Sequence, residues 1–428
     1  GSTTSILVNV PGEAASVVTT LDGYQMMKKG RAGAALAVAA IGSFVAGTIG
    51  LVLMTFLAPP IARMAIKFGP PEYFAIVLAG LLILSRLTDK SLIRSYLLIS
   101  LGIVIALIGL DPSSGGLRLT FGSQWLIDGV NFIPIIMGLY GLSEVIGSLE
   151  QQFHRPEKAD LSLRKLMPSR EEMKRSAGPM VRGGLLGFLM GLLPGPANIL
   201  STYASYGLEK KLSKRPKEFG KGAIEGVAGP ESANNGASAG ALVPLLSLGV
   251  PFSPMPAILL SAFMIQGVTP GPLMMSQHSG LFWALIASMY IGNVMLLVLN
   301  LPMVGLFAKV ANLQPKVLMP IVMIFCFIGA YSVRSSMFDI IVMIVFGVLG
   351  YLLRKAKMEP SPLVLGVMLG PTLESSFKQS TLIFHGDLTQ FFARPISGTL
   401  LVAALVVTVW PLVSRLVRRR VSAGTEKA

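Results

Sequence analysis

A short run, GPESANNG at residues 229–236, concentrates polar side chains inside an otherwise apolar segment. The carboxylate of Glu231 and the amides of Asn234 and Asn235 together supply oxygen ligands for a cation and N–H donors for a carboxylate. An acidic side chain at the centre of a bilayer costs about 3 kcal/mol. If this segment crosses a membrane, Glu231 therefore has to line a cavity. The alternative is a solvated helix end near the membrane surface, with the asparagines as helix caps.

The composition places this run in an integral membrane protein. Of 428 residues, 52% are hydrophobic and 13% are charged, and the mean hydropathy is +0.68, whereas soluble proteins have about 25% charged residues. A spanning helix needs about 20 apolar residues, so we expect an all-α polytopic fold with roughly ten membrane elements, some short or broken. The candidate spans are 33–57, 95–110, 130–148, 279–307, 317–333, 337–353 and 396–413.

The net charge of +15 comes from loops. Residues 149–182 carry eight Lys and Arg, residues 209–221 carry six, and the tail is also rich in arginine. Basic loops beside apolar spans are cytoplasmic by the positive-inside rule, so we predict that all three regions face the cytoplasm. We prefer this interpretation to a nucleic-acid surface, and we expect no nucleic-acid partner.

Metal and enzyme chemistry are poorly supported by the remaining polar residues. The single cysteine, Cys326, lies in an apolar run, and His154, His278 and His385 are far apart in sequence. Neither a disulfide framework nor an HExxH-like metal site is therefore expected. We find no GxxxxGK[ST] phosphate loop and no pairing of a nucleophile with a base. The sequence predicts no catalytic residues, no metal site and no cofactor.

The chain contains a long internal repeat. Residues 57–84 resemble 299–326 at a shift of 242, and residues 6–21 resemble 245–260 at a shift of 240 when Pro11 is set on Pro251. Structural repeats of this kind build many secondary transporters, often with inverted topology. We predict a first repeat at 1–148, without its opening segment, a basic cytoplasmic linker at 149–182, a second repeat at 183–413, and a basic cytoplasmic tail at 414–428.

Helix breakers mark candidate binding segments within both repeats. Pro194, Gly195 and Pro196 interrupt the run 183–208 at its middle, and proline removes a backbone donor and clashes with the preceding turn. We expect either a re-entrant hairpin with its tip here or a kinked full span. Non-helical backbone survives in lipid only where protein or a water-filled cavity surrounds it. The break therefore indicates a cavity.

Such breaks can bind both an anionic substrate and a coupling cation. Helix N-termini carry free N–H groups and a partial positive charge that favour anions, and carbonyl oxygens and polar side chains hold Na⁺ or H⁺. The predicted substrate-binding residues are Ser2, Thr3, Thr4, Asn9, Pro11, Gly12, Pro194, Gly195, Pro196, Asn234, Asn235, Pro251 and Ser253. The predicted cation-coupling residues are Glu231, Asn234, Asn235 and Asp22. We expect the basic residues after Asp22 to be a cytoplasmic anchor.

Two blocks of the sequence resemble one known family. They are residues 3–44, which begin TTSILVNVPGEAASVV, and residues 191–251, which contain GLLPGPANILSTYASYGL and GPESANNGASAGALVP. The chain resembles the large membrane subunit (TctA) of the tripartite tricarboxylate transporter family over essentially its whole length. The residues that match the family's motifs are Asn9, Pro11, Gly12, Asp22, Gly23, Pro194, Gly195, Tyr203, Glu225, Pro230, Glu231, Asn234, Asn235 and Pro251.

The resemblance implies a multi-pass permease of the bacterial cytoplasmic (inner) membrane. Such a permease works with a small membrane subunit and a periplasmic solute-binding protein that captures an organic carboxylate such as citrate, and a cation gradient drives its transport. Where the family follows the second Val-Pro with small residues, this chain has Phe252, Ser253, Pro254, Met255 and Pro256. We therefore expect this segment to influence substrate choice.

We accordingly predict a cation-coupled secondary transporter. The regions 9–12 and 231–235 are expected to meet near the midplane beside the Pro194 break, with Na⁺ or H⁺ as the coupling ion. A passive anion channel is one alternative, and its uptake would survive collapse of both ion gradients. An intramembrane enzyme is a further alternative, which would need a constellation of acidic or nucleophilic side chains.

Overall fold

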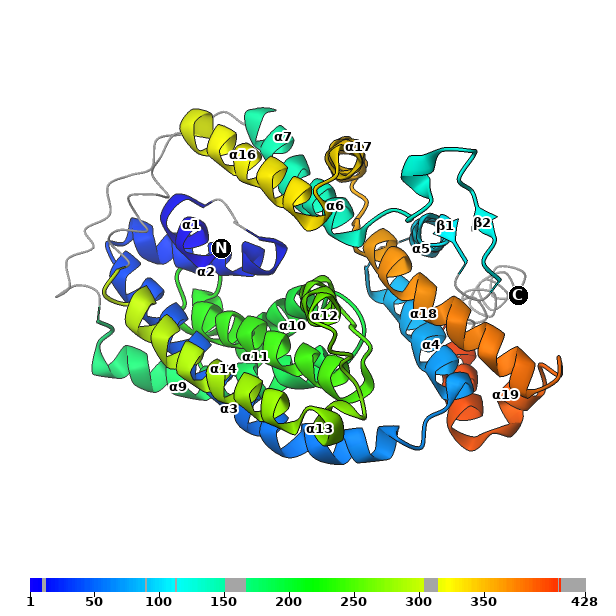
Figure 1. Cartoon of the computed structure of the whole chain (residues 1–428). Coiled ribbons are helices and arrows are strands. Elements are labelled where there is room, and N and C mark those ends of the chain that lie inside the picture. The colour runs from blue at the N-terminus through cyan, green and yellow to red at the C-terminus, as the bar shows by residue number, and fades with distance from the viewer. Residues whose placement is uncertain are drawn as a thin grey trace, which may run out of the picture. The chain divides into compact units, whose positions relative to one another are not determined.

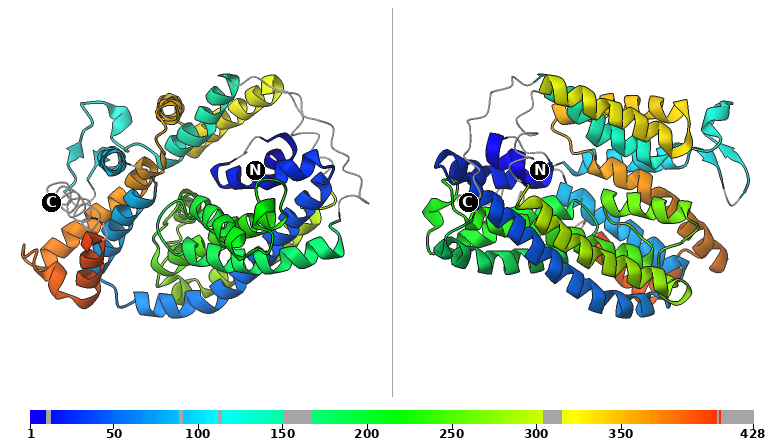
Figure 2. Two further views of the ribbon diagram at one scale, coloured as in Figure 1. Left: turned by 180° about the vertical axis from the view of Figure 1, so that it is seen from behind. Right: turned by 60° about the vertical axis from the view of Figure 1, so that its left-hand side comes forward.

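The computed structural model of the chain describes residues 1–9, 13–88, 91–111, 114–150, 167–303, 315–406 and 408. Two predicted site residues, Pro11 and Gly12, lie outside the described residues, as do residues 151–166 of the basic linker and the whole tail 414–428. The described part is helical apart from a short antiparallel hairpin of β1 (Gly109–Leu110) and β2 (Leu117–Arg118), as Figures 1 and 2 show. The predicted all-α fold is confirmed.

Several helices are suited to a bilayer. Among the described residues, three are long and apolar enough to cross a membrane: Ala32–Met64, Ser279–Asn300 and Met337–Lys355. Shorter apolar helices are Pro70–Leu82, Leu92–Ala106, Phe132–Ser148, Pro254–Ile265, Met319–Arg334 and Pro395–Val406. Each of the seven candidate spans overlaps one of these helices, and residues 304–307, 407 and 409–413 of two of the spans lie outside the described residues. The composition and these helices make the chain a multi-pass membrane protein.

The chain divides into two compact units. Unit 1 consists of Gly1–Ala65 and Gly147–Val322, and unit 2 consists of Ile66–Ile146 and Met323–Ala428. Each half of the sequence therefore contributes to both units. The boundary predicted at Gly183 falls inside a helix, because α9 continues through it from Arg170 to Gly191.

Unit 1 is built around a central helix, α11 (Glu225–Leu248), of which nineteen of 24 residues are buried. Helices α9, α3, α10 and α2 pack against it. The other elements of unit 1 are α1 (Ser2–Val8), η1 (Ala14–Ser16), α2 (Val17–Lys28), α3 (Ala32–Ala65), α9 (Arg170–Gly191), α10 (Ala197–Leu212), η4 (Pro216–Glu218), α12 (Pro254–Ile265), α13 (Met274–Gln277) and α14 (Ser279–Asn300). The polar run thus lies in the most enclosed helix of this unit.

The helix α11 is continuous through Pro230 and Pro244. A proline inside a helix commonly kinks or breaks it, but here the helix ends only at Leu248, and Gly249 follows in the left-handed conformation with φ 71°. Neighbouring helices and local adjustments can satisfy the backbone groups that a proline frees in a membrane helix. Glu231 and the asparagines are therefore interior helix residues, and the alternative of a solvated or capping helix end is wrong.

The seam between α9 and α11 is made of small residues. A Cβ atom added at Gly187 would lie 2.0 Å from the carbonyl oxygen of Ala233. Comparable contacts with facing carbonyl oxygens occur along the same seam at Gly183, Gly191, Gly236 and Gly240. Small residues let membrane helices approach with their backbones in contact. The seam fixes α9, and with it the break that follows α9, against the polar run of α11.

We predict that Gly187→Ala lowers the stability of unit 1 by about 1–3 kcal/mol, because the added methyl group overpacks a backbone contact. Gly207→Ala in α10 is the matched control, since no atom lies within 4 Å of the methyl group it would add. The measurement is thermal unfolding of both purified variants in the same detergent. Equal melting temperatures for the two variants would contradict the predicted packing of the seam.

Unit 2 consists mainly of α4 (Pro70–Thr88), α5 (Leu92–Ala106), α17 (Met337–Lys355) and α18 (Ser361–Ile383). Its remaining elements are the β1–β2 hairpin, η2 (Gln124–Leu126), α6 (Phe132–Ile136), the π-helical turn η3 (Met137–Leu142), α7 (Ser143–Glu150), α16 (Pro315–Arg334) and α19 (Gln390–Ala393), with α7 and α16 crossing the division. Helix α18 packs against α4 and α5, and α17 packs against η3. Buried carboxylates are paired here too: Asp339 is bonded to Arg334 at 2.6 Å and Glu72 to Arg394 at 3.2 Å.

Candidate functional site

Glu231 lies in the second turn of α11 with only 3% of its surface exposed. Its Oε2 accepts a hydrogen bond from Ser2 Oγ at 2.6 Å, and its Oε1 accepts one from Thr19 Oγ1. No Lys, Arg or His side chain forms an ion pair with it in the described part of the chain. A buried carboxylate surrounded by hydroxyl oxygens supplies the hard oxygen donors that suit a small cation or a proton.

A second polar group joins three parts of unit 1. The side chain of Asn198, at the start of α10, donates to Asn234 Oδ1 at 2.8 Å and to Ser238 Oγ at 2.8 Å. Asn234 Nδ2 in turn lies 3.3 Å from Glu13 Oε1. Glu13 directly follows the predicted segment 9–12. The structure therefore brings Glu13, the start of α10 after the Pro194 break, and the polar run of α11 together.

Asn235 lies on a different side of α11. Its Nδ2 donates to Ser43 Oγ of α3 at 2.8 Å and to the carbonyl oxygen of Glu231 at 3.0 Å. One face of Asn235 lines a pocket of about 520 Å³. Asn235 therefore connects the surroundings of Glu231 to this pocket.

The pocket has an apolar wall and a few convergent polar groups. Its polar lining residues are Asn198, Asn235, Ser238, Ser253 and Asn293. The apolar wall includes Met255, Pro256 and Met289, so the segment in which the sequence departs from the family pattern forms part of the lining. Small-molecule sites in proteins typically have this volume and this mixture of surfaces.

The predicted break at Pro194–Pro196 lies against a second break in the structure. Residues 192–196 separate α9 from α10, and residues 249–253 separate α11 from α12. The N–H of Gly195, which has φ 134°, donates to the carbonyl oxygen of Phe252 at 3.0 Å. Pro251 is buried, and Ser253 ends the second break at the pocket.

The remaining predicted residues of the first segment are placed as follows. Ser2 and Thr3 line a smaller pocket of about 170 Å³ together with Ser43 and Asn300. Thr4 donates to the carbonyl oxygen of Gly1 at 2.9 Å, which is a local contact within α1. Asn9 is exposed and ends α1 in the left-handed conformation with φ 57°. The structure thus joins Ser2 to Glu231 but gives Thr4 and Asn9 no contact with the polar run.

Asp22 occupies a separate site. Its carboxylate accepts the N–H groups of Gly222 and Ala223 at 2.7 and 2.8 Å and the hydroxyl of Tyr206 at 2.9 Å. These contacts fix the turn that leads into α11. Glu231 lies six residues along α11 from Glu225, the first residue of the helix, or about 9 Å at 1.5 Å per residue. Among the described residues, no hydrogen bond connects Asp22 with Glu231.

Sequence reasoning missed several members of the site. Thr19 bonds directly to Glu231, and Asn198 is the centre of the second polar group. Asn293, in the apolar helix α14, donates to Phe44 O and Thr48 Oγ1, both at 3.0 Å. The signal for Asn293 was available, because a lone amide inside a 22-residue apolar helix is expensive in lipid unless it is bonded. Among the described residues, no group of three or more His, Cys, Asp or Glu is placed to hold a metal ion.

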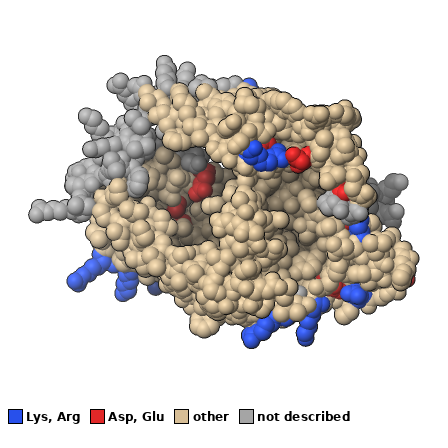
Figure 3. Space-filling view, viewed as in Figure 1, with Lys and Arg blue, Asp and Glu red and all other residues tan. Residues whose placement is uncertain are grey.

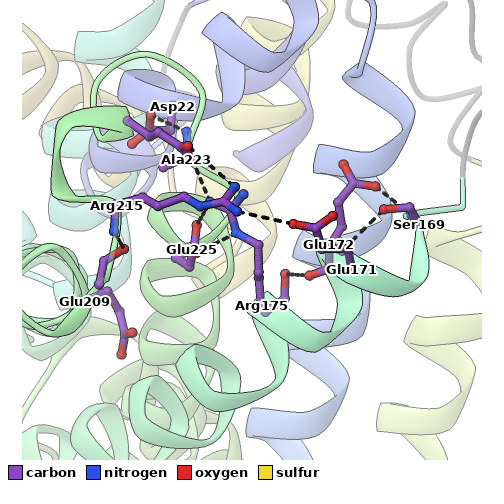
Figure 4. A network of polar contacts seen from close by, with 12 residues as sticks. Asp22, Ser169, Glu171, Glu172, Arg175, Glu209, Arg215, Ala223 and Glu225 are labelled. Carbon is purple, nitrogen blue, oxygen red and sulfur yellow. Dashed lines mark hydrogen bonds and ion pairs between the residues drawn. The ribbon is translucent and has the colours of Figure 1, made fainter.

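Several charged side chains of unit 1 contact one another around Arg175, and most of the face shown in Figure 3 carries no charged side chain. Arg175 points from α9 to Glu225, with Nε–Oε1 and Nη2–Oε2 both at 2.8 Å (Figure 4), and it also contacts Glu218 at 2.7 Å. Hydrogen bonds from the Arg175 guanidinium hold the pKa of Glu218 below its usual range. Arg31 is paired with Glu172. The predicted basic segments of unit 1 therefore converge at the same end.

Comparison with known proteins agrees with these observations. The sequence model of the tripartite tricarboxylate transporter TctA family matches residues 1–365. An uncharacterized 52.8 kDa protein in the TAR-I ttuC' 3' region of Agrobacterium vitis is 45% identical over 420 residues, covering 98% of this chain and 84% of the relative. A second uncharacterized protein, in the TAR-II ttuC' 3' region of the same organism, is 47% identical over 234 residues, covering 55% of this chain and 97% of the relative. No solved structure matches the chain. The chain belongs to the tripartite tricarboxylate transporter TctA family, a family of transporter components and not of enzymes.

Proposed function

We propose that this protein is the permease of a cation-coupled importer of organic carboxylates. A solute-binding protein in the periplasm delivers the substrate, and a small membrane subunit completes the transporter in the bacterial inner membrane. The observation that carries the proposal concerns Asn235, which lines the pocket of about 520 Å³ and also donates to the backbone oxygen of Glu231, the residue with the buried carboxylate. Membership of the family supports the transporter part.

The residues fall into two roles in this proposal. The amides of Asn198 and Asn235 and the hydroxyls of Ser238 and Ser253 orient the substrate carboxylate in the pocket. Glu231, with Ser2 and Thr19, binds Na⁺ or H⁺. Because Asn235 donates to the backbone oxygen of Glu231, occupancy of the cation site and the position of the substrate amide are linked. Energetic linkage of this kind is what coupled transport requires.

We propose further that the chain is built from two repeats. Helices α2, α3, α4 and α5 follow one another in the same order as α12, α14, α16 and α17, and the paired helices begin roughly 240 residues apart. In both series the first two helices belong to unit 1 and the later ones lie mainly in unit 2. Alternating access then results from the movement of one unit against the other.

Replacement of Asn235 by Ala tests the substrate site. We expect uptake to fall by at least about tenfold, because a hydrogen bond to a charged group is worth about 1.5–3 kcal/mol. The measurement is uptake of radiolabelled di- and tricarboxylates into proteoliposomes that hold the complete transporter, with the sodium and proton gradients removed in turn. Gln266→Ala, which removes an exposed amide at the end of α12, is the control. Unchanged kinetics in Asn235→Ala would exclude the assigned role.

Substrate choice is assigned to the apolar wall formed by Met255 and Pro256. Met255→Ser replaces a long apolar side chain by a short polar one, so the pocket becomes larger and its wall more polar. We therefore expect it to raise uptake of the more highly charged tricarboxylates relative to dicarboxylates. The same substrate panel measures the ratio, and Met264→Ser, on the same helix and outside the pocket lining, is the control. An identical ratio in the two variants would show that this wall does not select the substrate.

A further inference from the structure

A second pocket, of about 410 Å³, opens at the basic end of unit 1. The proposed transport route does not use it. Its lining is dominated by cations from three segments that are distant in sequence: Lys29, Arg31, Arg175, Arg215, Lys217 and Lys221. Glu218 is the carboxylate among its lining residues. The volume lies within the range of small-ligand sites, about 300–1,000 Å³.

The arginines of this pocket are held in place by carboxylates. Arg175 is bonded to Glu225 and Glu218, and Arg31 is paired with Glu172. Arg215 contacts Glu171 at 3.5 Å and Glu218 at 3.6 Å. These pairs fix the guanidinium groups as the wall of the pocket while neutralising much of their charge. A bonded guanidinium keeps further N–H groups for another acceptor, because it has five donors.

The three lysines carry the uncompensated charge. In the described part of the chain, Lys29, Lys217 and Lys221 form no ion pair. Lys29 Nζ donates instead to the carbonyl oxygen of Lys221 at 2.5 Å, which places the ammonium group of Lys29 beside the loop that carries the other two. Like charges held around one pocket repel one another, and a bound anion relieves that repulsion. The arrangement therefore favours an anion with several acceptor oxygens.

The position of the pocket indicates where the anion comes from. The basic segments mark the cytoplasmic end of unit 1 by the positive-inside rule, and basic pockets between membrane helices on that side bind lipid headgroups. Apolar surface adjoins the charges: a neighbouring pocket shares Arg175 and Arg215 and includes Leu212, whose side chain is 55% exposed. A phospholipid can place its phosphate among the cations and an acyl chain on such a surface.

We propose that this pocket binds the phosphate group of an anionic phospholipid of the cytoplasmic leaflet. Arginine and lysine recognise phosphate by complementary means, since the guanidinium fork forms paired hydrogen bonds and the ammonium acts as a point charge. The lipid ties the end of α2, the start of α9 and the loop before α11 together. The bound lipid then stabilises unit 1 independently of any transported substrate.

The test measures the melting temperature of the purified full chain in detergent during titration with phosphatidylglycerol. Phosphatidylcholine and inorganic phosphate are titrated in parallel. We expect a saturable rise in melting temperature with phosphatidylglycerol, and no such rise with phosphatidylcholine or inorganic phosphate. In the double variant Lys217→Gln/Lys221→Gln the apparent affinity falls by at least about tenfold. The matched control Lys210→Gln/Lys211→Gln removes the same charge from exposed positions on α10 outside the pocket and retains the affinity.

A third variant separates charge from folding. Lys217→Arg/Lys221→Arg keeps both cations, so it retains binding if the charges matter and the loop is intact. If the pocket variant and the control variant lost the same amount of lipid affinity, the binding would come from diffuse surface charge, and the proposal would be overturned. An equal rise in melting temperature with phosphatidylcholine and with phosphatidylglycerol would overturn the proposal as well. A saturable rise with inorganic phosphate that matches the lipid would make a free phosphate compound the ligand and exclude the lipid. None of these readouts depends on uptake, so the transport proposal can fail while this one stands.

Discussion

Replacing Glu231 by Gln is expected to abolish cation-driven uptake while leaving a folded membrane protein. Glutamine has the same shape. Its amide oxygen accepts a hydrogen bond from one of the two hydroxyls, Ser2 or Thr19, and its amide nitrogen donates to the other, because a hydroxyl can also accept, so the packing of α11 is preserved. The negative charge to which we assign cation binding is lost. Since loss of an interaction with a charged group costs up to about 3 kcal/mol, we expect uptake under a cation gradient to fall by about 100-fold.

Two comparisons sharpen this test. Glu171→Gln removes a carboxylate that is 71% exposed at the basic end of unit 1, and it should leave uptake within about twofold, because exposed ion pairs contribute little. Thr19→Val removes a hydroxyl that touches Glu231, whereas Thr20→Val removes a neighbouring hydroxyl that bonds to the backbone of Val17. Only the Thr19 change should weaken the dependence on the cation. A Glu231→Gln protein with an unaltered cation requirement would exclude Glu231 as the coupling group.

The second large effect concerns Arg182. We expect Arg182→Met to destabilise unit 1 by about 2–4 kcal/mol. The guanidinium binds Glu209 through Nε–Oε1 at 2.9 Å and Nη2–Oε2 at 2.6 Å, and Glu209 is 2% exposed. Removing one partner of a buried pair costs about 3–5 kcal/mol because a buried charge loses its partner. The lower range applies here because the Arg182 side chain is itself 43% exposed.

The double variant Arg182→Met/Glu209→Gln checks the cause. Glutamine removes the stranded charge in the last turn of α10, where the helix dipole already disfavours an anion, so most of the stability should return. Arg215→Met is the control, because its ion pairs are 3.5 and 3.6 Å long and its side chain is 55% exposed. Thermal unfolding in detergent measures all three variants. Failure of the glutamine to restore stability would show that packing, and not charge, is what Arg182 contributes.

Composition and local breakers were enough to predict much of the fold. The helical spans follow from runs of apolar residues, and the break at Pro194 to Pro196 follows from the lost backbone donors and the fixed proline geometry. The same rule failed at Pro230 and Pro244, where α11 continues. Local sequence does not show that α11 is enclosed by α9, α3, α10 and α2. Packing on several sides keeps a helix intact where an isolated one would kink.

The site was predicted in part, and the errors have a common cause. Glu231 and Asn235 were identified because polar residues are expensive in apolar segments, and the structure shows them beside each other. Asp22 satisfied the same criterion, yet its partners are backbone N–H groups 200 residues away in the sequence. Asn198 was overlooked beside the conspicuous prolines, although it connects the break to the polar run. The free-energy cost of a polar side chain in an apolar segment identifies a residue that needs a hydrogen-bond partner. Only the fold shows which residue that partner is.

The hydrogen bond between Gly195 and Phe252 has a mechanical consequence. It fastens the loop between α9 and α10 to the loop between α11 and α12, so the ends of four helices meet at one joint. A displacement of any one of these four helix ends therefore strains the hydrogen bond between Gly195 and Phe252, which connects it to the other three. Asn198 and Ser253 flank this joint, so the hydrogen bond holds together two polar residues that line the pocket.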